Sequence, residues 1–107
     1  MDYYAKCSGR GHEFLRAGDF NEAINEYYKA IDYSSGVGDK MKAALYCDLA
    51  KAYEERALIK YQNNKTARQS DFVTALQYYL MSLQLDPSCP AVNNWTNRCR
   101  RWIENSF

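Results

Sequence analysis

The sequence lacks several features that mark common functional classes. No apolar run approaches the ~18 residues that span a bilayer, so we expect no transmembrane segment. The first ten residues contain no apolar stretch of the kind found in signal peptides. The net charge is only +1, whereas domains that bind nucleic acid usually carry a clear basic excess. These absences favour a cytoplasmic, intracellular protein and argue against nucleic acid as its partner.

Glycine and proline are scarce, with five and two residues, while tyrosine is abundant, with ten. A chain with few turn-forming residues and many large aromatics favours packed helices over a turn-rich β fold. At 107 residues, the length fits one domain with a modest core. We therefore expect a single helical domain.

The residues that usually build catalytic or metal sites are few and widely spaced. The four cysteines, Cys7, Cys47, Cys89 and Cys99, form no Cys-x-x-Cys pair, so we expect reduced thiols in a reducing compartment and no zinc site. His12 is the only histidine, and no nucleophile or carboxylate pattern accompanies it. We expect no enzyme activity, no metal and no cofactor.

Helical spacing of apolar residues covers nearly the whole chain. Breaks fall at Gly18, within residues 34–38 and 62–66, and at Asp86–Pro87. The pattern predicts an all-α fold with five helices, over about residues 2–17, 20–33, 40–61, 67–85 and 89–105.

Several residues at these breaks have the chemistry of helix ends. We expect Asp19 and Asp39 to cap the second and third helices. Residues 63–66 offer turn and cap groups before the fourth helix. Ser88 or Cys89 would cap the fifth, with Pro90 in its first turn, where a missing N–H costs nothing.

Two helical hairpins repeat the same pattern of small and large residues. A shift of 52 residues places Asp19-Phe20 on Asp71-Phe72 and Ala23-Ile24 on Ala75-Leu76. The helices before them align with a shift of 39, which places Gly11 on Ala50. Small residues at these matched positions let the two helices of a hairpin approach closely.

This pattern resembles the tetratricopeptide repeat, a helix-turn-helix unit of about 34 residues. The segment "GHEFLRAGDFNEAINEYYKAI" is similar to one repeat, and "LYCDLAKAY" with "DFVTALQYYLMSLQLDP" is similar to a second. The resemblance implies repeat one over about residues 3–36, repeat two over about 39–87, and a capping helix over about 89–105. Such arrays need a terminal helix that covers the last repeat.

The second repeat departs from the family pattern. The two shifts differ by 13 residues, so it contains an insertion, at about residues 54–70. Because Ala57, Leu58, Ile59 and Tyr61 favour a helix, we expect each helix of this hairpin to gain about two turns. The prediction is an elongated second hairpin that projects beyond the first.

The resemblance also implies where a partner would bind. In this family the first helix of each hairpin lines a groove that receives a segment of another protein. The positions that match here are Ser8, His12, Arg16, Cys47, Asp48, Lys51, Glu54, Glu55, Asn94, Arg98 and Arg101. The family's clamp for acidic C-terminal tails is not expected, because Ser8 and His12 replace its Lys and Asn, and Asp48 would repel a carboxylate.

Aromatic and basic residues outside the groove are expected to be structural. Trp95, Cys99 and Trp102 form one stripe of the last helix, which leaves its arginines as a solvated rim. Tyr28 and Tyr78 flank core positions and are the tyrosines expected to make exposed contacts.

The sequence thus favours a non-enzymatic scaffold or adaptor that binds a peptide or helix of a partner protein. Exposed end faces of so short an array also favour a homodimer. Two alternatives stay open. One is a client-specific chaperone, similar to secretion chaperones built from this repeat. The other is a nucleic-acid-binding module that uses Arg98, Arg100 and Arg101.

Overall fold

The computed structural model describes residues 3–88 and 90–105, and this part of the chain folds into five helices without strands. The all-α prediction is therefore confirmed. The helices are α1 (Tyr3–Ala17), α2 (Phe20–Asp32), α3 (Asp39–Ile59), α4 (Lys65–Leu85) and α5 (Pro90–Asn105). None of these described helices is both long and apolar enough to cross a membrane.

The end of α1 follows from the backbone freedom of one glycine. Gly18 has φ 83°, a left-handed conformation that glycine adopts without steric cost. Its N–H bonds the Leu15 carbonyl at 3.1 Å, and the N–H of Asp19 bonds the Phe14 carbonyl at 2.9 Å. This pair of bonds is the Schellman arrangement that closes many helices, and it turns the chain directly into α2.

The cap predicted at Asp19 is confirmed in position only, and the cap predicted at Asp39 is wrong. Asp19 occupies the N-cap position of α2, but its side chain makes no cap hydrogen bond. Asp39 is the first residue of α3, and Gly38 precedes it in the cap position. There Asp39 places a negative charge in the first turn, where it favours the helix through the dipole.

The caps of the last two helices have different outcomes. The cap of α4 is confirmed, because the Asn64 side chain accepts a hydrogen bond from the Ala67 N–H at 3.1 Å. The backbone N–H and hydroxyl of Ser88 both donate to the Asp86 carboxylate. Cys89, the other residue expected to cap α5, lies outside the described residues.

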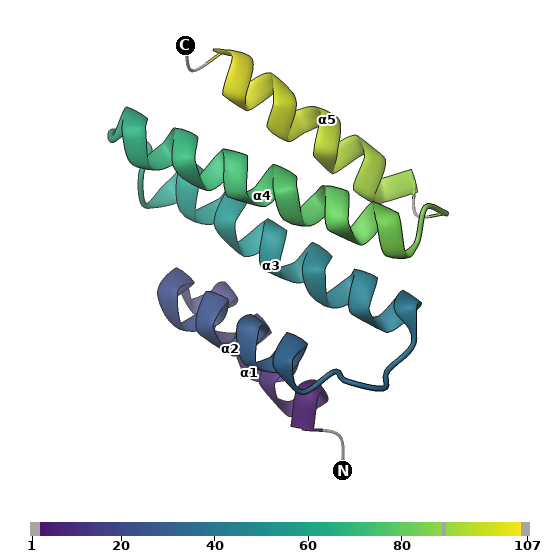
Figure 1. Cartoon of the computed structure of the whole chain (residues 1–107). Helices are drawn as coiled ribbons and strands as arrows, with labels where there is room; N and C mark the ends of the chain where they lie inside the picture. The colour runs from purple at the N-terminus through teal and green to yellow at the C-terminus, as the bar shows by residue number, and fades with distance from the viewer. Residues whose placement is uncertain (1–2, 89, 106–107) are drawn as a thin grey trace.

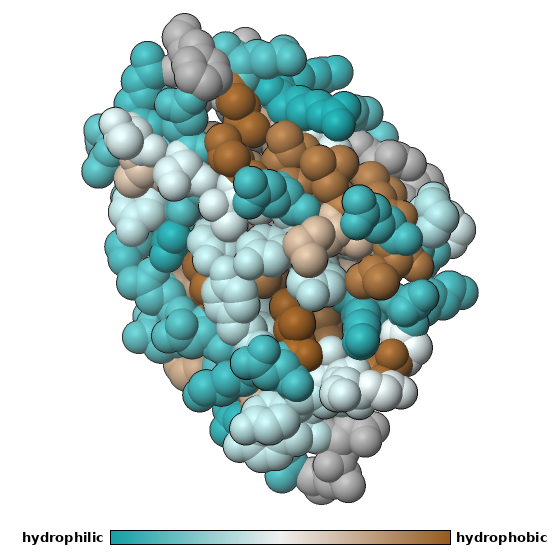
Figure 2. Space-filling view, viewed as in Figure 1, coloured by the Kyte–Doolittle hydropathy of each residue, from teal (hydrophilic) through white to brown (hydrophobic). Residues whose placement is uncertain are grey.

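The helices form two antiparallel pairs and a final helix, each packed against the next along the chain (Figure 1). The α1–α2 pair lies at one end of the stack, α3–α4 in the middle and α5 at the other end. The molecule measures 44 × 29 × 17 Å. Seen from the side on which α2 and α4 lie in front, its surface has an apolar band over α4 and α5 (Figure 2).

The second hairpin is longer than the first, as the insertion predicted. Helices α3 and α4 have 21 residues each, whereas α1 has 15 and α2 has 13. The difference is close to two helical turns in each arm. The guanidinium of Arg56 makes two hydrogen bonds of 2.7 Å to the Asp71 carboxylate in the other arm and a third, of 2.8 Å, to Asn21 in α2.

The core lies between consecutive helices at the small positions that the repeat pattern singled out. Ala23, Ala50 and Ala75 are fully buried. Gly11 is buried as well, and the ring of Tyr27 lies so close that an added Cβ would stand 2.7 Å from its nearest atom. The predicted close approach within the hairpins is confirmed.

Three tyrosines join α2, α3 and α4. The Tyr28 hydroxyl lies 2.7 Å from that of Tyr53 and 2.9 Å from that of Tyr78. Burial and the hydrogen bond with Tyr28 raise the pKa of Tyr78 to about 12. Tyr28 and Tyr78 were expected to make exposed contacts, and that prediction is wrong: both are half-buried and bonded to each other.

Candidate functional site

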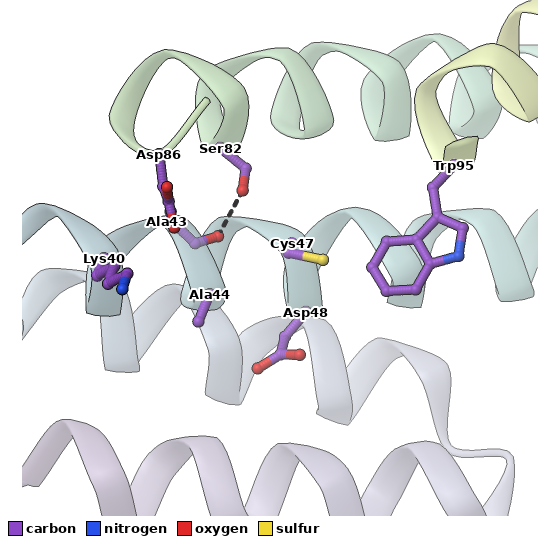
Figure 3. Close-up of a pocket in the computed structure, with 8 residues that line it drawn as sticks. All are labelled: Lys40, Ala43, Ala44, Cys47, Asp48, Ser82, Asp86 and Trp95. Carbon is purple, nitrogen blue, oxygen red and sulfur yellow. Dashed lines mark hydrogen bonds between the residues drawn. The ribbon is translucent and has the colours of Figure 1, made fainter. Parts of the chain in front are cut away.

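Two hollows lie along α3 and bring together six of the residues predicted to line a groove. The first, of about 230 Å³, lies between α1 and α3. The second, of about 220 Å³, lies between α3, the end of α4 and the start of α5 (Figure 3). The first is lined by His12, Leu15, Arg16, Lys51 and Glu55. The second is lined by Lys40, Ala43, Ala44, Cys47, Asp48, Ser82, Asp86 and Trp95.

The hollows meet at a pair of side chains, one from each. His12 in α1 places Nε2 3.6 Å from the carboxylate of Asp48 in α3. On the other side of the ring, Nδ1 lies 2.9 Å from the hydroxyl of Tyr27. Burial raises the pKa of Tyr27, so its hydroxyl keeps its proton. The imidazole ring is thus held between this hydroxyl and the Asp48 carboxylate.

Two carboxyl groups of the site, those of Asp48 and Glu55, have a raised pKa. Burial raises the pKa of Asp48, and the nearby His12 and Lys51 act in the opposite direction. The pKa of Glu55 is also raised, mainly by burial. Carboxylates that have lost water in this way are ready to accept hydrogen bonds from an incoming donor, because fewer water contacts have to be displaced.

The second hollow has an apolar floor and a charged rim. Trp95 extends from α5 toward α3, and Ala43 and Ala44 supply small side chains to the lining on the other side of Cys47 (Figure 3). The hydroxyl of Ser82 donates to the Ala43 carbonyl at 2.7 Å, which fixes the end of α4 against α3. Lys40 and the carboxylates supply both signs of charge at the edge.

The prediction that Glu54 faces a partner is wrong. Its side chain is only 2% exposed, and it lies among α3, α4 and α5. The Arg98 guanidinium donates two hydrogen bonds to its carboxylate, at 2.8 and 2.9 Å. The Tyr79 hydroxyl donates a third at 3.1 Å, and the Cys99 thiol lies 3.5 Å from the carboxylate. Burial raises the pKa of both Tyr79 and Cys99, so both keep their protons.

This cluster also changes the role expected for Arg98. Its side chain is 46% exposed, but its polar atoms neutralise the Glu54 carboxylate, and that hydrogen bonding raises the pKa of Arg98. Arg98 therefore fixes α5 to α3 and is not a free cation for a partner. A nucleic-acid site built on Arg98, Arg100 and Arg101 would therefore lack one of its three cations.

The remaining predicted groove residues lie apart from the two hollows. Ser8 is half-buried on α1, and Asn94 and Arg101 are exposed on α5; none of the three lines either hollow. Cys7 and Cys99 are buried free thiols. Among the described residues, no group of three or more His, Cys, Asp or Glu side chains is placed to hold a metal ion.

Sequence reasoning missed most of the second hollow. Trp95 was assigned to the packing stripe, and it does contact Tyr79, with ring centroids 5.9 Å apart, but it also forms the hollow's wall. The neighbouring Ala43 and Ala44, one turn before Cys47 on α3, were the available signal. Two small residues beside a predicted groove position leave room for a hollow, which Trp95 of α5 borders.

Comparison with known proteins adds no relative: no family model, curated protein or solved structure matches this chain. The candidate site therefore rests on its own geometry.

Proposed function

We propose that this chain is a non-enzymatic scaffold that binds a segment of a partner protein across the two hollows along α3. The observation that carries this proposal is the second hollow, where an apolar floor beside Trp95 is bordered by Lys40, Asp48 and Asp86. A few oriented polar groups around an apolar hollow are typical of binding sites. The arrangement suits one apolar side chain of the partner, flanked by charged or amide groups.

The site is built to stay rigid. His12 is held from both sides by Tyr27 and Asp48, and Arg98 locks α5, which supplies Trp95, onto α3. A preformed site orders few of its own side chains on binding, which lowers the free-energy cost of association. The tetratricopeptide-like order of small and large residues supports the same proposal, since stacked hairpins of that kind present their first helices to a partner.

The proposal is tested by filling the second hollow without disturbing the core. Ala44 is exposed and lines the hollow, so Ala44→Arg places a long side chain in it on an intact helix. The matched control is Ala5→Arg, at an exposed position of α1. Affinity capture from an extract of the source cells, with mass spectrometry, compares both variants with the parent chain.

We expect a protein that is retained by the parent and by Ala5→Arg and lost from Ala44→Arg. Addition of that protein's purified binding segment should then quench or shift the tryptophan fluorescence, to which Trp95 contributes. A partner that binds Ala44→Arg as tightly as the parent contradicts the proposed site. Recovery of RNA alone contradicts a protein partner.

A further inference from the structure

The outward-facing side of α4 carries no charge over most of its length. From Gln69 to Leu85 the only charged residue is Asp71, and its side chain is buried and paired with Arg56. The exposed residues of this segment are Ser70, Val73, Gln77, Leu80, Met81 and Gln84. We call these six residues the outer stripe.

The outer stripe is continuous along the helix. At about 100° per residue, Val73, Gln77, Leu80 and Gln84 point away from the buried Ala75 and Tyr79. Val73 is 39% exposed, Leu80 37% and Met81 39%. The apolar band of Figure 2 lies over this helix and its seam with α5. The stripe shares no residue with the two hollows along α3.

In the first hairpin, the face of α2 that corresponds to the outer stripe lacks this apolar character. At the shift of 52, Val73 matches Asn21, Met81 matches Lys29 and Gln84 matches Asp32, all exposed and polar. Leu80 matches Tyr28, which Tyr53 and Tyr78 cover. At Val73, Leu80 and Met81, α4 is apolar and exposed where α2 is polar or covered, and at Gln84 it is uncharged where α2 has Asp32. The difference indicates that α4 has a partner of its own.

We propose that this partner is a second copy of the chain, bound through the outer stripes of two antiparallel α4 helices related by a twofold axis. An uncharged face is complementary to itself, because a twofold axis sets each group near its own copy and would bring like charges together. Gln77, near the middle of the stripe, has an amide that both donates and accepts hydrogen bonds, so it can pair with its own copy. A strongly charged partner would find no counter-charge here.

The size of the stripe predicts a weak dimer. Residues 69–84 span about 24 Å of helix, and a strip of that length and of a helix width of about 10 Å covers about 240 Å². A stable complex buries about 800 Å² on each side. We therefore expect dissociation in the micromolar range, with the dimer dominant at a few hundred micromolar.

The test is sedimentation velocity of the full chain from about 10 to 500 µM, together with two matched variants. Leu80→Glu puts a charge on the outer stripe, and Leu58→Glu puts the same charge on α3 at a leucine that is also 37% exposed. We expect the parent and Leu58→Glu to dimerise, and Leu80→Glu to be monomeric or weakened at least tenfold. Circular dichroism checks that each variant is folded.

A second measurement does not depend on how Leu80→Glu folds. Gln77→Cys should form an intermolecular disulfide on mild oxidation, above the background of the native cysteines in the parent. Asn25→Cys, at the matched exposed position of α2, should not. A parent that is monomeric at 500 µM overturns the proposal, as does an equal dimer in Leu80→Glu or equal cross-linking at both cysteine positions. None of these results bears on the two hollows, so the proposed function is tested separately.

Discussion

The absence of a side chain at Gly11 allows the ring of Tyr27 to pack directly against the backbone of α1. A Cβ at this position would stand 2.7 Å from the buried ring of Tyr27, whereas a Cβ at Gly9, on the same helix, would meet nothing within 4 Å. The ring is fully buried, so it has little room to retreat. The closeness of α1 and α2 depends on this glycine.

We predict opposite effects of the same substitution at the two glycines. Gly11→Ala should lower the free energy of unfolding by about 1–3 kcal/mol, the usual cost of overpacking a core. Gly9→Ala should raise it by about 0.5–1 kcal/mol, because alanine favours the helix. Urea unfolding followed by circular dichroism measures both. Equal effects at the two sites would show that the ring moves aside freely.

The raised pKa of Asp48 makes stability depend on pH. Because burial raises this pKa, the folded chain holds the proton more tightly than the unfolded chain does. The contribution of the group to stability is therefore present in full below its ordinary pKa of about 3.9. It is lost as the pH rises through the folded-state value.

We predict that Asp48→Asn raises the free energy of unfolding more at pH 7 than at pH 4. Urea unfolding at the two pH values measures the difference. The control is Glu13→Gln, at an exposed position of α1, which should stay within about 0.5 kcal/mol of the parent at both. A gain from Asp48→Asn that is the same at pH 4 and pH 7 would contradict this explanation.

At the level of helices, the number and the order of the helices could be predicted from the sequence, whereas the residues that cap them could be predicted only in part. Apolar spacing and the breaks at Gly18 and Pro87 place the five helices within two residues of their described ends. Asp19 takes the predicted N-cap position of α2 without a side-chain cap hydrogen bond, and Gly38 takes the position expected for Asp39. Spacing predicts where a helix begins but not which hydrogen bonds its first residues make. The insertion was predictable because helix-forming residues filled it.

The candidate site was predictable only in part. Positions on one helix face, such as His12 and Arg16, follow from spacing alone. The burial of Glu54 does not, because it depends on a guanidinium from α5, 44 residues further along. Trp95 likewise lines the second hollow only because α5 packs beside α3 and α4, which the spacing within α5 does not predict.

Within the elongated hairpin, Arg56 is the residue that ties three helices together. Its planar guanidinium forms two bonds to Asp71 and one to Asn21, and it lies 5.2 Å from the ring centroid of Tyr53. A lysine ammonium cannot reproduce this fork. We predict that Arg56→Lys lowers the free energy of unfolding by about 2 kcal/mol, the scale of hydrogen bonds to a charged group.

Thermal and urea unfolding of Arg56→Lys measure this loss. The control is Arg16→Lys, at an exposed position of α1, which should stay within about 0.5 kcal/mol of the parent. If the two substitutions have the same effect, the fork does not hold the hairpin.

For the molecule as a whole, the Glu54–Arg98 pair connects α5 to the rest of the stack. Both tryptophans lie in α5, so tryptophan fluorescence reports this helix, while far-ultraviolet circular dichroism reports all five. We predict that the two signals give the same urea midpoint in the parent chain, because the pair makes unfolding cooperative.

In Arg98→Met the urea midpoint measured by tryptophan fluorescence should fall below the midpoint measured by circular dichroism. A buried carboxylate without its partner destabilises the α5 interface by about 3 kcal/mol. The double variant Glu54→Met/Arg98→Met should bring the midpoints together again, because no charge is left buried. Coincident midpoints in Arg98→Met would mean that α5 is held by apolar packing alone.

The same pair has a consequence for synthesis on the ribosome. Glu54 is made 44 residues before Arg98, and at about 5–20 residues per second the interval is about 2–9 s. During that interval the α3–α4 hairpin must either leave this carboxylate in water or bury it without a counter-charge. The α3–α4 hairpin can therefore reach its final packing only after α5 has been translated.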